Sequence, residues 1–269
     1  RRSLANELGP LATFFIRLLM NQLEGKVAIV TGGAGGFGEG IARAYVAEGA
    51  RVVIADVERG KGEALARELG PAARFAHCDV SLKQDIGALV RACIDHFGPP
   101  DIVVNNAGTT HTNMPLLDVD EATFDRVFAV NVKSIYHMVL AVVPLMRKRG
   151  SGVILNIGST AGIRPRPGLT WYNASKGAVN LLSKSLAVEL GPHRIRVNAI
   201  CPVIGETGLR EQFMGAPDTP ENRAKFLATI PLGRMCRPSD VAAAAVYLAS
   251  DAAEFISGVE FPVDGARTA

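Results

Sequence analysis

The sequence has few of the features that mark nucleic-acid-binding proteins, membrane proteins or proteins of oxidising compartments. Its 29 Lys and Arg against 26 Asp and Glu leave a net charge of only +3 in 269 residues. So small an excess creates no strong field of one sign, and we predict no nucleic-acid partner. The four cysteines lie far apart and match neither a zinc site nor a thioredoxin-like pair. We expect reduced, buried thiols and a cytoplasmic location.

Metal-ligand patterns and long apolar runs are missing as well. None of the five histidines stands at a recognisable ligand spacing from a cysteine or a carboxylate, so we predict no metal. The apolar run at 11–20, LATFFIRLLM, contains Arg17 and is about half as long as a membrane span, so we predict no span. We assign 1–19 to an N-terminal extension, either an upstream remnant or a packing helix, and 20–269 to a single domain.

Short β-branched runs alternate with stretches of helical period from Lys26 onward. This rhythm is typical of βαβ units, and the nearly continuous apolar character of the runs indicates strands buried on both faces. We therefore predict an α/β single-domain Rossmann fold, a doubly wound parallel sheet of about seven strands with helices on both faces. The predicted strands are KVAIVT, RVVIAD, RFAHCD, DIVVNNAG, GVILNIGS, RIRVNAI and VEFPVD, and the predicted helices lie near 37–49, 59–69, 82–97, 120–149, 172–190 and 238–250.

A glycine-rich turn, TGGAGGFG at Thr31–Gly38, joins the first predicted strand to the first helix. Glycines let the backbone approach a pyrophosphate, whose charge is stabilised at the helix N-terminus. Glycine also closes ordinary loops, but here the strand and helix that a dinucleotide site requires flank the motif. Asp56 ends the second strand, where its carboxylate suits the ribose hydroxyls of NAD and repels the 2′-phosphate of NADP. We predict NAD, and Arg59 is the residue that could still favour NADP.

Tyr172 and Lys176 stand four residues apart in YNASK, so both side chains lie on one face of a predicted helix. Ser159 closes the strand GVILNIGS, and strand ends are where open α/β sheets bind ligands. Reduction of a ketone by hydride needs a proton for the oxygen, and alcohol oxidation needs that proton removed. Tyrosine can do both if its pKa, ordinarily about 10, is lowered, and we expect the charge of Lys176 to lower it. A Tyr-x-x-x-Lys pair alone is also common on solvated helix faces.

These motifs resemble the short-chain dehydrogenase/reductase family, in particular 3-oxoacyl carrier-protein reductases and glucose dehydrogenases. The resemblance extends over about 23–264 and rests on three motifs. They are TG-x-x-x-G-x-G at Gly32, Gly36 and Gly38, NNAG at Asn105–Gly108, and the set Ser159, Tyr172 and Lys176. The resemblance implies an NAD(P)-dependent oxidoreductase that acts on CH–OH groups.

The same resemblance implies a role for each catalytic residue. Ser159 would polarise the substrate oxygen, Tyr172 would transfer the proton, and Lys176 would also bind the nicotinamide ribose. Asn131, in FAVNV, matches the fourth member of the family's set. It is expected to interrupt the long helix and to hold a water that connects Lys176 to solvent.

Fourteen residues are expected at the cofactor. They are Gly32, Gly36, Phe37, Gly38, Asp56, Asp79, Val80, Asn106, Ala107, Gly108, Tyr172, Lys176, Pro202 and Thr207. Asp79 has an alternative, because an Asp after a strand can equally cap a turn. Val203 stands where the family commonly has glycine, so the register of Thr207 as the carboxamide ligand is open, and backbone groups of Val203 or Ile204 are the alternative.

Substrate contacts are expected in two segments. In GIRPRPG, Arg164 and Arg166 either bind an anionic group, such as a carboxylate or an acyl-carrier phosphopantetheine, or are simply solvated. The segment 203–237 is rich in Gly and Pro and is predicted to be a substrate lid. Its apolar candidates are Leu209, Phe213, Met214, Phe226 and Leu227. Trp171 is a pocket wall or part of the core.

We therefore predict hydride transfer between NAD and a secondary alcohol or ketone. Two alternatives remain open: an NADPH-dependent 3-oxoacyl-thioester reductase and a non-catalytic NAD-sensing protein. The family usually forms tetramers, and the long helix near 120–149 carries more apolar residues than one buried stripe needs. A homotetramer is expected.

Overall fold

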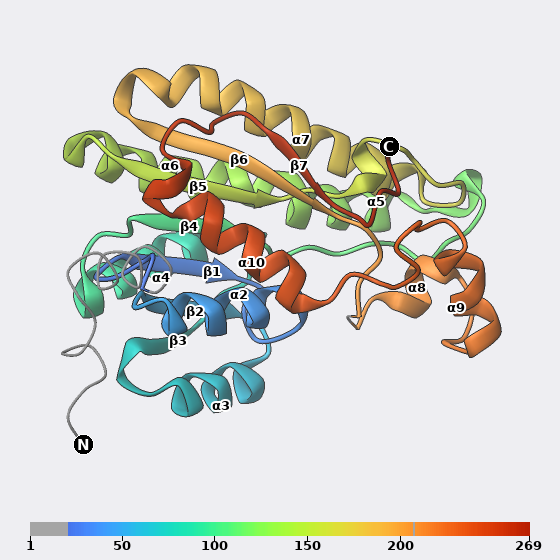
Figure 1. Cartoon of the computed structure of the whole chain (residues 1–269), viewed down its shortest axis with the longest axis horizontal. Helices are drawn as coiled ribbons and strands as arrows, with labels where there is room; N and C mark the ends of the chain where they lie inside the picture. The colour runs from blue at the N-terminus through green and yellow to red at the C-terminus, as the bar shows by residue number, and fades with distance from the viewer. Residues whose placement is uncertain (1–20, 207) are drawn as a thin grey trace, which may run out of the picture.

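A computed structural model of the chain describes residues 21–206 and 208–269. The predictions for the N-terminal extension and for Thr207 lie outside these residues. One seven-stranded sheet forms the centre, in the order β3-β2-β1-β4-β5-β6-β7, and every pairing is parallel (Figure 1). The strands are β1 (Val27–Thr31), β2 (Arg51–Asp56), β3 (Ala73–His77), β4 (Ile102–Asn105), β5 (Gly152–Ile157), β6 (Ile195–Pro202) and β7 (Glu260–Val263).

Helices cover both faces of the sheet, as predicted. They are α2 (Gly36–Ala47), α3 (Arg59–Leu69), α4 (Lys83–Phe97), α5 (Glu121–Phe128), α6 (Ser134–Arg149), α7 (Thr170–Leu190), α8 (Arg210–Met214), α9 (Pro220–Leu227) and α10 (Pro238–Ala249). One core lies between the sheet and α2, α3 and α10, and a second lies beneath α4, α6 and α7. Successive strand side chains point to opposite faces, so in β1 Val30 joins the first core and Ile29 the second.

The long helix predicted near 120–149 is interrupted. A π-helical turn, Ala129–Lys133, separates α5 from α6 and contains Asn131, as the sequence predicted. By length and composition alone, the stretch Glu121–Arg149 is apolar enough to cross a membrane, with a mean hydropathy of 1.5. In the structure part of its apolar side chains, such as Met138, pack in the second core beside α4, whereas others, such as Leu140, are exposed. The absence of a membrane span stays a prediction.

The strand order places a crevice at one edge of the sheet. The chain builds β1 to β3 in one direction and then crosses back to pair β4 with the other side of β1. In open parallel sheets, ligands bind at such a switch point, outside the carboxyl ends of the strands. The segment after β6, which contains α8 and α9, lies beside the same ends (Figure 1). The predicted lid therefore lies where a ligand is expected.

Candidate active site

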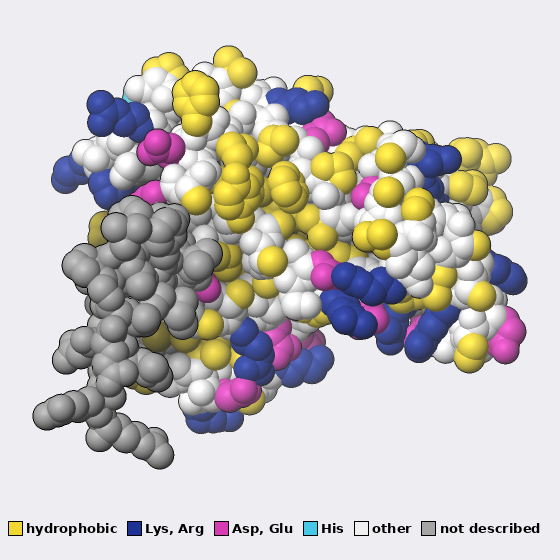
Figure 2. Space-filling view, viewed as in Figure 1, with side chains coloured by type: hydrophobic (Ala, Val, Ile, Leu, Met, Phe, Trp, Pro, Cys, Tyr) yellow, Lys and Arg dark blue, Asp and Glu magenta, His cyan; other side chains and the backbone are white. Residues whose placement is uncertain are grey.

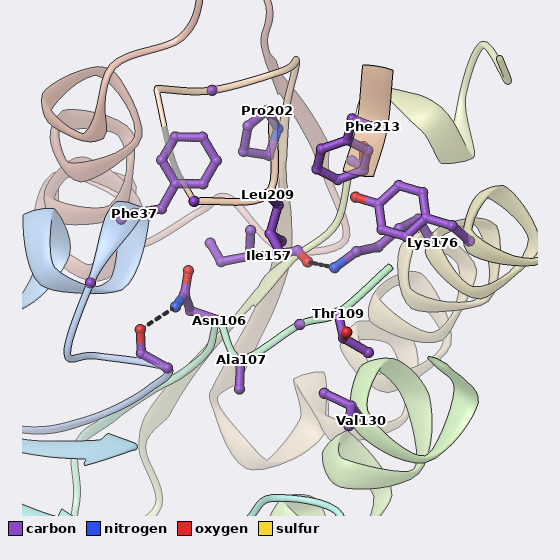
Figure 3. Close-up of a pocket in the computed structure, with 18 of the residues that line it drawn as sticks. Phe37, Asn106, Ala107, Thr109, Val130, Ile157, Lys176, Pro202, Leu209 and Phe213 are labelled. Carbon is purple, nitrogen blue, oxygen red and sulfur yellow. Dashed lines mark hydrogen bonds between the residues drawn. The ribbon is translucent and has the colours of Figure 1, made fainter. Parts of the chain in front are cut away.

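A cavity of about 940 Å³ opens at the carboxyl ends of the strands. Most of the predicted site residues line it (Figure 3). They are Gly32, Gly36, Phe37, Asp56, Asp79, Val80, Asn106, Ala107, Gly108, Ser159, Tyr172, Lys176 and Pro202. Two predicted residues, Gly38 and Asn131, do not line the cavity and act through other residues, and Thr207 lies outside the described part of the chain.

The glycine turn contains one glycine that is tightly enclosed and another that faces open space. Gly32 and Gly36 adopt φ values of +60° and +54°, which favour glycine. A Cβ added at Gly38 would overlap the carbonyl oxygen of Gly32, whereas one added at Gly35 would meet nothing within 4 Å. Gly35 also precedes α2 without a side-chain cap, so the first amides of the helix remain available to an anion. The turn therefore fits a pyrophosphate, and Gly35 was missed as a candidate although it stands in the motif.

The NNAG segment holds this turn in place. The Asn106 side chain donates from Nδ2 to the carbonyl oxygens of Thr31 and Gly32, at 2.8 and 3.0 Å. Figure 3 shows one of these bonds as a dashed line from Asn106. In return, Thr31 Oγ1 accepts hydrogen bonds from the backbone N–H of Asn106 and Ala107. Thr31 was also missed as a site residue, although it is the first residue of TGGAGGFG.

The carboxylate of Asp56 lies at the end of β2 and lines the cavity. Its oxygens accept from the backbone N–H of Ala34 and of Glu58, each at 3.0 Å. Arg59, which was the one reservation to the prediction of NAD, does not line the cavity and pairs with Glu63. Lys61, in the first turn of α3, is the basic side chain that does line this end. Sequence inspection missed it because the wall formed by α3 depends on how that helix packs.

Asp79 both caps a turn and lies at the cavity, the two roles that the sequence left open. Its Oδ1 accepts hydrogen bonds from the backbone N–H and the hydroxyl of Ser81, at 2.9 and 2.7 Å, and so caps a turn. Asp79 also lines the cavity beside Val80. Within the described residues, Oδ2 accepts no hydrogen bond, which leaves it open to a ligand.

The predicted catalytic side chains lie together and are buried. Ser159, Tyr172 and Lys176 are 8%, 7% and 5% exposed. Lys176 donates from Nζ to the carbonyl oxygen of Ile157 at 2.7 Å, and this nitrogen lies 6.0 Å from the centre of the Tyr172 ring (Figure 3). Burial lowers the pKa of Lys176 to about 8.

The expectation that Lys176 lowers the pKa of Tyr172 is not met in this structure. Burial raises the pKa of Tyr172 to about 12, and a hydrogen bond to Ser159 offsets only part of this effect. The physical reason is that burial disfavours the phenolate, whereas Lys176 is bound to the Ile157 carbonyl. Tyr172 is therefore protonated at neutral pH.

Asn131 connects the loop after β4 to the helix that carries Tyr172. Its Oδ1 accepts from the backbone N–H of Thr109, and its Nδ2 donates to the Thr109 carbonyl and to Ser175 Oγ, all within 2.8–3.0 Å. Ser175 in turn donates to the Tyr172 carbonyl at 2.7 Å. Asn131 thus positions α7 from the π-helical turn, and its water relay stays a prediction. Ser175 was missed, although it lies inside YNASK.

The lid contributes only some of its predicted apolar residues. Leu209, Phe213 and Phe226 line the cavity, whereas Met214 and Leu227 do not. The Phe213 ring lies edge-on to the Tyr172 ring, with centroids 5.0 Å apart (Figure 3). Trp171 lies off the cavity and packs edge-on against Phe124, so it is a packing residue rather than a pocket wall.

The segment after β6 uses some of the backbone groups that were considered for the carboxamide contact. The N–H of Val203 donates to the Val263 carbonyl in β7 at 3.2 Å, and the Ile204 carbonyl accepts from the Cys236 N–H at 3.1 Å. These two groups are therefore already paired, whereas no hydrogen bond of the Ile204 N–H is found among the described residues, so a backbone contact to the nicotinamide stays a prediction. Pro202, Val203 and Ile204 still line the cavity with apolar side chains.

Known proteins share both the sequence and this arrangement. Residues 32–267 match the family model described as enoyl-(acyl carrier protein) reductase. The chain is 50% identical to a 4-formylbenzenesulfonate dehydrogenase of Comamonas testosteroni, over 91% of this chain and 98% of that protein. It is 37% identical to 2-(S)-hydroxypropyl-CoM dehydrogenase 3 of Xanthobacter autotrophicus, over 93% of this chain and 100% of that protein.

A solved structure is similar as well. A 3-ketoacyl-(acyl-carrier-protein) reductase from Brucella melitensis, complexed with NADH, superposes with a TM-score of 0.88 at 44% identity and covers 92% of this chain and 100% of that one. Together with the glycine turn and the buried Ser159, Tyr172 and Lys176, these matches identify the chain as a member of the short-chain dehydrogenase/reductase family, an oxidoreductase that acts on CH–OH groups.

Proposed function

We propose that the chain is an NAD-dependent dehydrogenase or reductase for a secondary alcohol or ketone. One observation carries the proposal: a single cavity joins the glycine turn, with its open position at Gly35, to the buried Ser159, Tyr172 and Lys176. When bound, the nicotinamide supplies or accepts the hydride. The remaining requirements are a proton for the substrate oxygen and a polar contact that orients it.

The side chains at the reacting end meet these requirements. The hydroxyl of Ser159 binds the substrate oxygen, which polarises the carbonyl and stabilises the charge that develops there. Tyr172 donates the proton during reduction, and its pKa of about 12 keeps it in the donating form at neutral pH. Lys176 binds the nicotinamide ribose, and Phe213 covers Tyr172 from the lid.

The preference for NAD rests on the acidic end of the cavity. Asp56 and Glu58 both line it, and two carboxylates would repel a 2′-phosphate. The Brucella reductase, which is similar over the whole domain, was crystallised with NADH. One observation favours the alternative, an NADPH-dependent 3-oxoacyl-thioester reductase. Lys61 also lines this end, and its ammonium group would attract a 2′-phosphate.

Fluorescence titration of NADH and NADPH tests this preference. We expect tighter binding of NADH by the wild type, and a smaller preference in Asp56→Ala, because the variant loses both the ribose contact and the repulsion. Arg59→Ala is the control and is expected to change nothing, since Arg59 lies off the cavity. Tighter NADPH binding that is lost in Lys61→Ala would contradict the proposal and favour the thioester reductase.

The reaction itself needs a turnover assay. The relatives are named for 4-formylbenzenesulfonate, 2-(S)-hydroxypropyl-CoM and cyclopentanol, so a small alcohol, ketone or aldehyde is the substrate class that we propose. With a panel of such ketones, the rate of NADH oxidation should be at least about 100-fold lower in Tyr172→Phe than in the wild type, while NADH binding remains. Binding without turnover on any substrate in the wild type would favour a non-catalytic NAD-sensing protein.

We also propose a homotetramer in the cytoplasm. Large apolar side chains on the outer faces of α6 and α7 are exposed, as expected for helices that pack against a second subunit. They are Tyr136, Leu140, Leu181 and Val188. Figure 2 shows further apolar side chains grouped on the face that carries β7 and α10. The four cysteines are free and buried, which supports a reducing compartment.

A further inference from the structure

An arginine from outside the catalytic set lines the same cavity. Arg166 belongs to the loop before α7, and its guanidinium group lies over the Phe226 ring of α9, 4.8 Å from the ring centre. Its Nη2 donates to Thr229 Oγ1 at 3.1 Å. Arg166 therefore connects the catalytic side of the cavity to the lid.

Arg166 has no acidic partner among the residues that the structure describes. Six other arginines, by contrast, are ion-paired with Asp or Glu. They are Arg43, Arg59, Arg149, Arg210, Arg223 and Arg234. Burial, together with the charges of Arg267 and Arg164, lowers the pKa of Arg166 to about 10, so it is still a cation at neutral pH.

Arg267 adds a second uncompensated cation at this corner. It is only 8% exposed, and its Nε and Nη1 have no hydrogen-bond partner among the described residues. Asp264 is the acid that acts on Arg267, but its oxygens already accept from the backbone N–H of Ala266 and of Thr268 and from the Thr268 hydroxyl. Together with Arg164, the corner beside the lid therefore carries more positive than negative charge.

We propose that Arg166 binds an anionic group, a carboxylate or a sulfonate, at the end of the substrate remote from the reacting carbon. Only one N–H of Nη2 is used by Thr229, so the second N–H of Nη2, together with Nε or Nη1, can meet two oxygens of such a group. Leu209, Phe213 and Phe226 then cover the apolar body of the substrate. This inference rests on the proposed function, since it assumes a ketone or alcohol whose oxygen lies at Ser159 and Tyr172.

A matched series of aryl ketones tests it. The anionic probes are 4-acetylbenzoate and 4-acetylbenzenesulfonate, which distinguish the two oxyanions, and 4-acetylbenzamide is the neutral analogue of similar shape. With NADH, we expect Arg166→Gln to raise KM for the preferred anionic ketone by about 10- to 100-fold with little change in kcat, because the contact is present before and during reaction. The KM of the amide and the affinity for NADH should change by less than about twofold.

Two further variants separate charge from position. Arg166→Lys keeps the charge but loses the planar fork and should give an intermediate KM. Arg164→Gln is the matched control, because it removes the same charge two residues away. The Arg164 guanidinium donates to the Arg267 carbonyl and does not line the cavity, so this variant should leave every KM within about twofold of the wild type.

Binding without turnover gives an independent readout. Calorimetric titration of 4-(1-hydroxyethyl)benzoate into the NADH complex cannot lead to hydride transfer, and Arg166→Gln should weaken this binding as much as it raises KM. Equal effects on anionic and neutral ketones, or a loss of NADH affinity instead, would overturn the inference while the proposed function stands. Failure of every ketone, neutral ones included, to oxidise NADH would instead overturn the proposed function.

Discussion

Burial shifts the pKa values of two neighbouring side chains in opposite directions at the reacting end of the cavity. It lowers that of Lys176 to about 8 and raises that of Tyr172 to about 12. In both cases the neutral form is favoured, because a charge in a poorly solvated site is costly. At pH 7 the structure therefore holds a neutral phenol beside a lysine that is charged at a cost to stability.

That cost can be measured through its pH dependence. Between about pH 8 and 10.5 the unfolded chain keeps a proton on Lys176 that the folded protein has released, so folding becomes more favourable as pH rises. The free energy of unfolding of the wild type should therefore rise by about 3 kcal/mol relative to Lys176→Met over this range. Urea unfolding without cofactor, from pH 7 to 10.5, measures the difference.

The exposed Lys148 on α6 provides the control for this measurement. Lys148→Met should show the same pH dependence as the wild type throughout. A constant stability difference between wild type and Lys176→Met would mean that burial does not shift the pKa of Lys176.

Two local elements, the glycine turn before α2 and the π-helical turn at Asn131, support the site in different ways. In the turn before α2, Gly38 is enclosed by backbone, whereas Gly35 faces the cavity and has nothing within 4 Å of an added Cβ. In the π-helical turn, Asn131 uses its side chain to join the loop after β4 to α7. One element therefore approaches the cofactor and the other supports the catalytic helix.

Two alanine substitutions in the turn should separate stability from binding. Gly38→Ala forces the backbone of Gly32 and the Asn106 amide to move, so we expect a loss of about 1–3 kcal/mol in unfolding free energy. Gly35 has extended backbone angles that any residue adopts, so Gly35→Ala should change stability by less than about 0.5 kcal/mol.

The methyl group of Gly35→Ala would occupy the space proposed for the pyrophosphate, and we expect NADH affinity to fall by about tenfold or more. Thermal unfolding and NADH titration on both variants measure the two effects. Wild-type NADH affinity in Gly35→Ala would mean that the pyrophosphate binds elsewhere.

The whole molecule presents its cavity on one edge and apolar helix faces on others. The exposed Leu181 and Val188 lie on α7, whose inner face carries Tyr172 and Lys176. A subunit interface on α7 would therefore also support the catalytic helix from behind.

Charged substitutions on that face should disrupt the proposed tetramer. We expect the double variant L181E/V188E to elute with the mass of a smaller species, because burying two carboxylates without partners is costly. Leu117, which is 88% exposed but lies outside α6, α7 and β7, provides the control, and Leu117→Glu should remain tetrameric. Size-exclusion chromatography with light scattering gives the mass, and a monomeric wild type would contradict the proposal.

The sequence by itself determined the features that depend on neighbours along the chain. The alternation of apolar runs predicted the parallel sheet, because strand and helix periods differ over short windows. The glycine turn was recognisable because strand, glycines and helix are contiguous, and Tyr172 with Lys176 because four residues make one helical turn. The interruption at Asn131 was predicted from the resemblance and is the π-helical turn between α5 and α6.

Features that depend on distant segments could be seen only in the folded chain. Thr31 meets Asn106 across 75 residues of sequence, and Arg166 meets Thr229 across 63. Arg59, and not Lys61, was singled out from the sequence, because which side of α3 faces the cavity depends on packing against the sheet. The pKa of Tyr172 was expected to fall and instead rises. Burial is a sum over the whole fold, and no local pattern in the sequence encodes it.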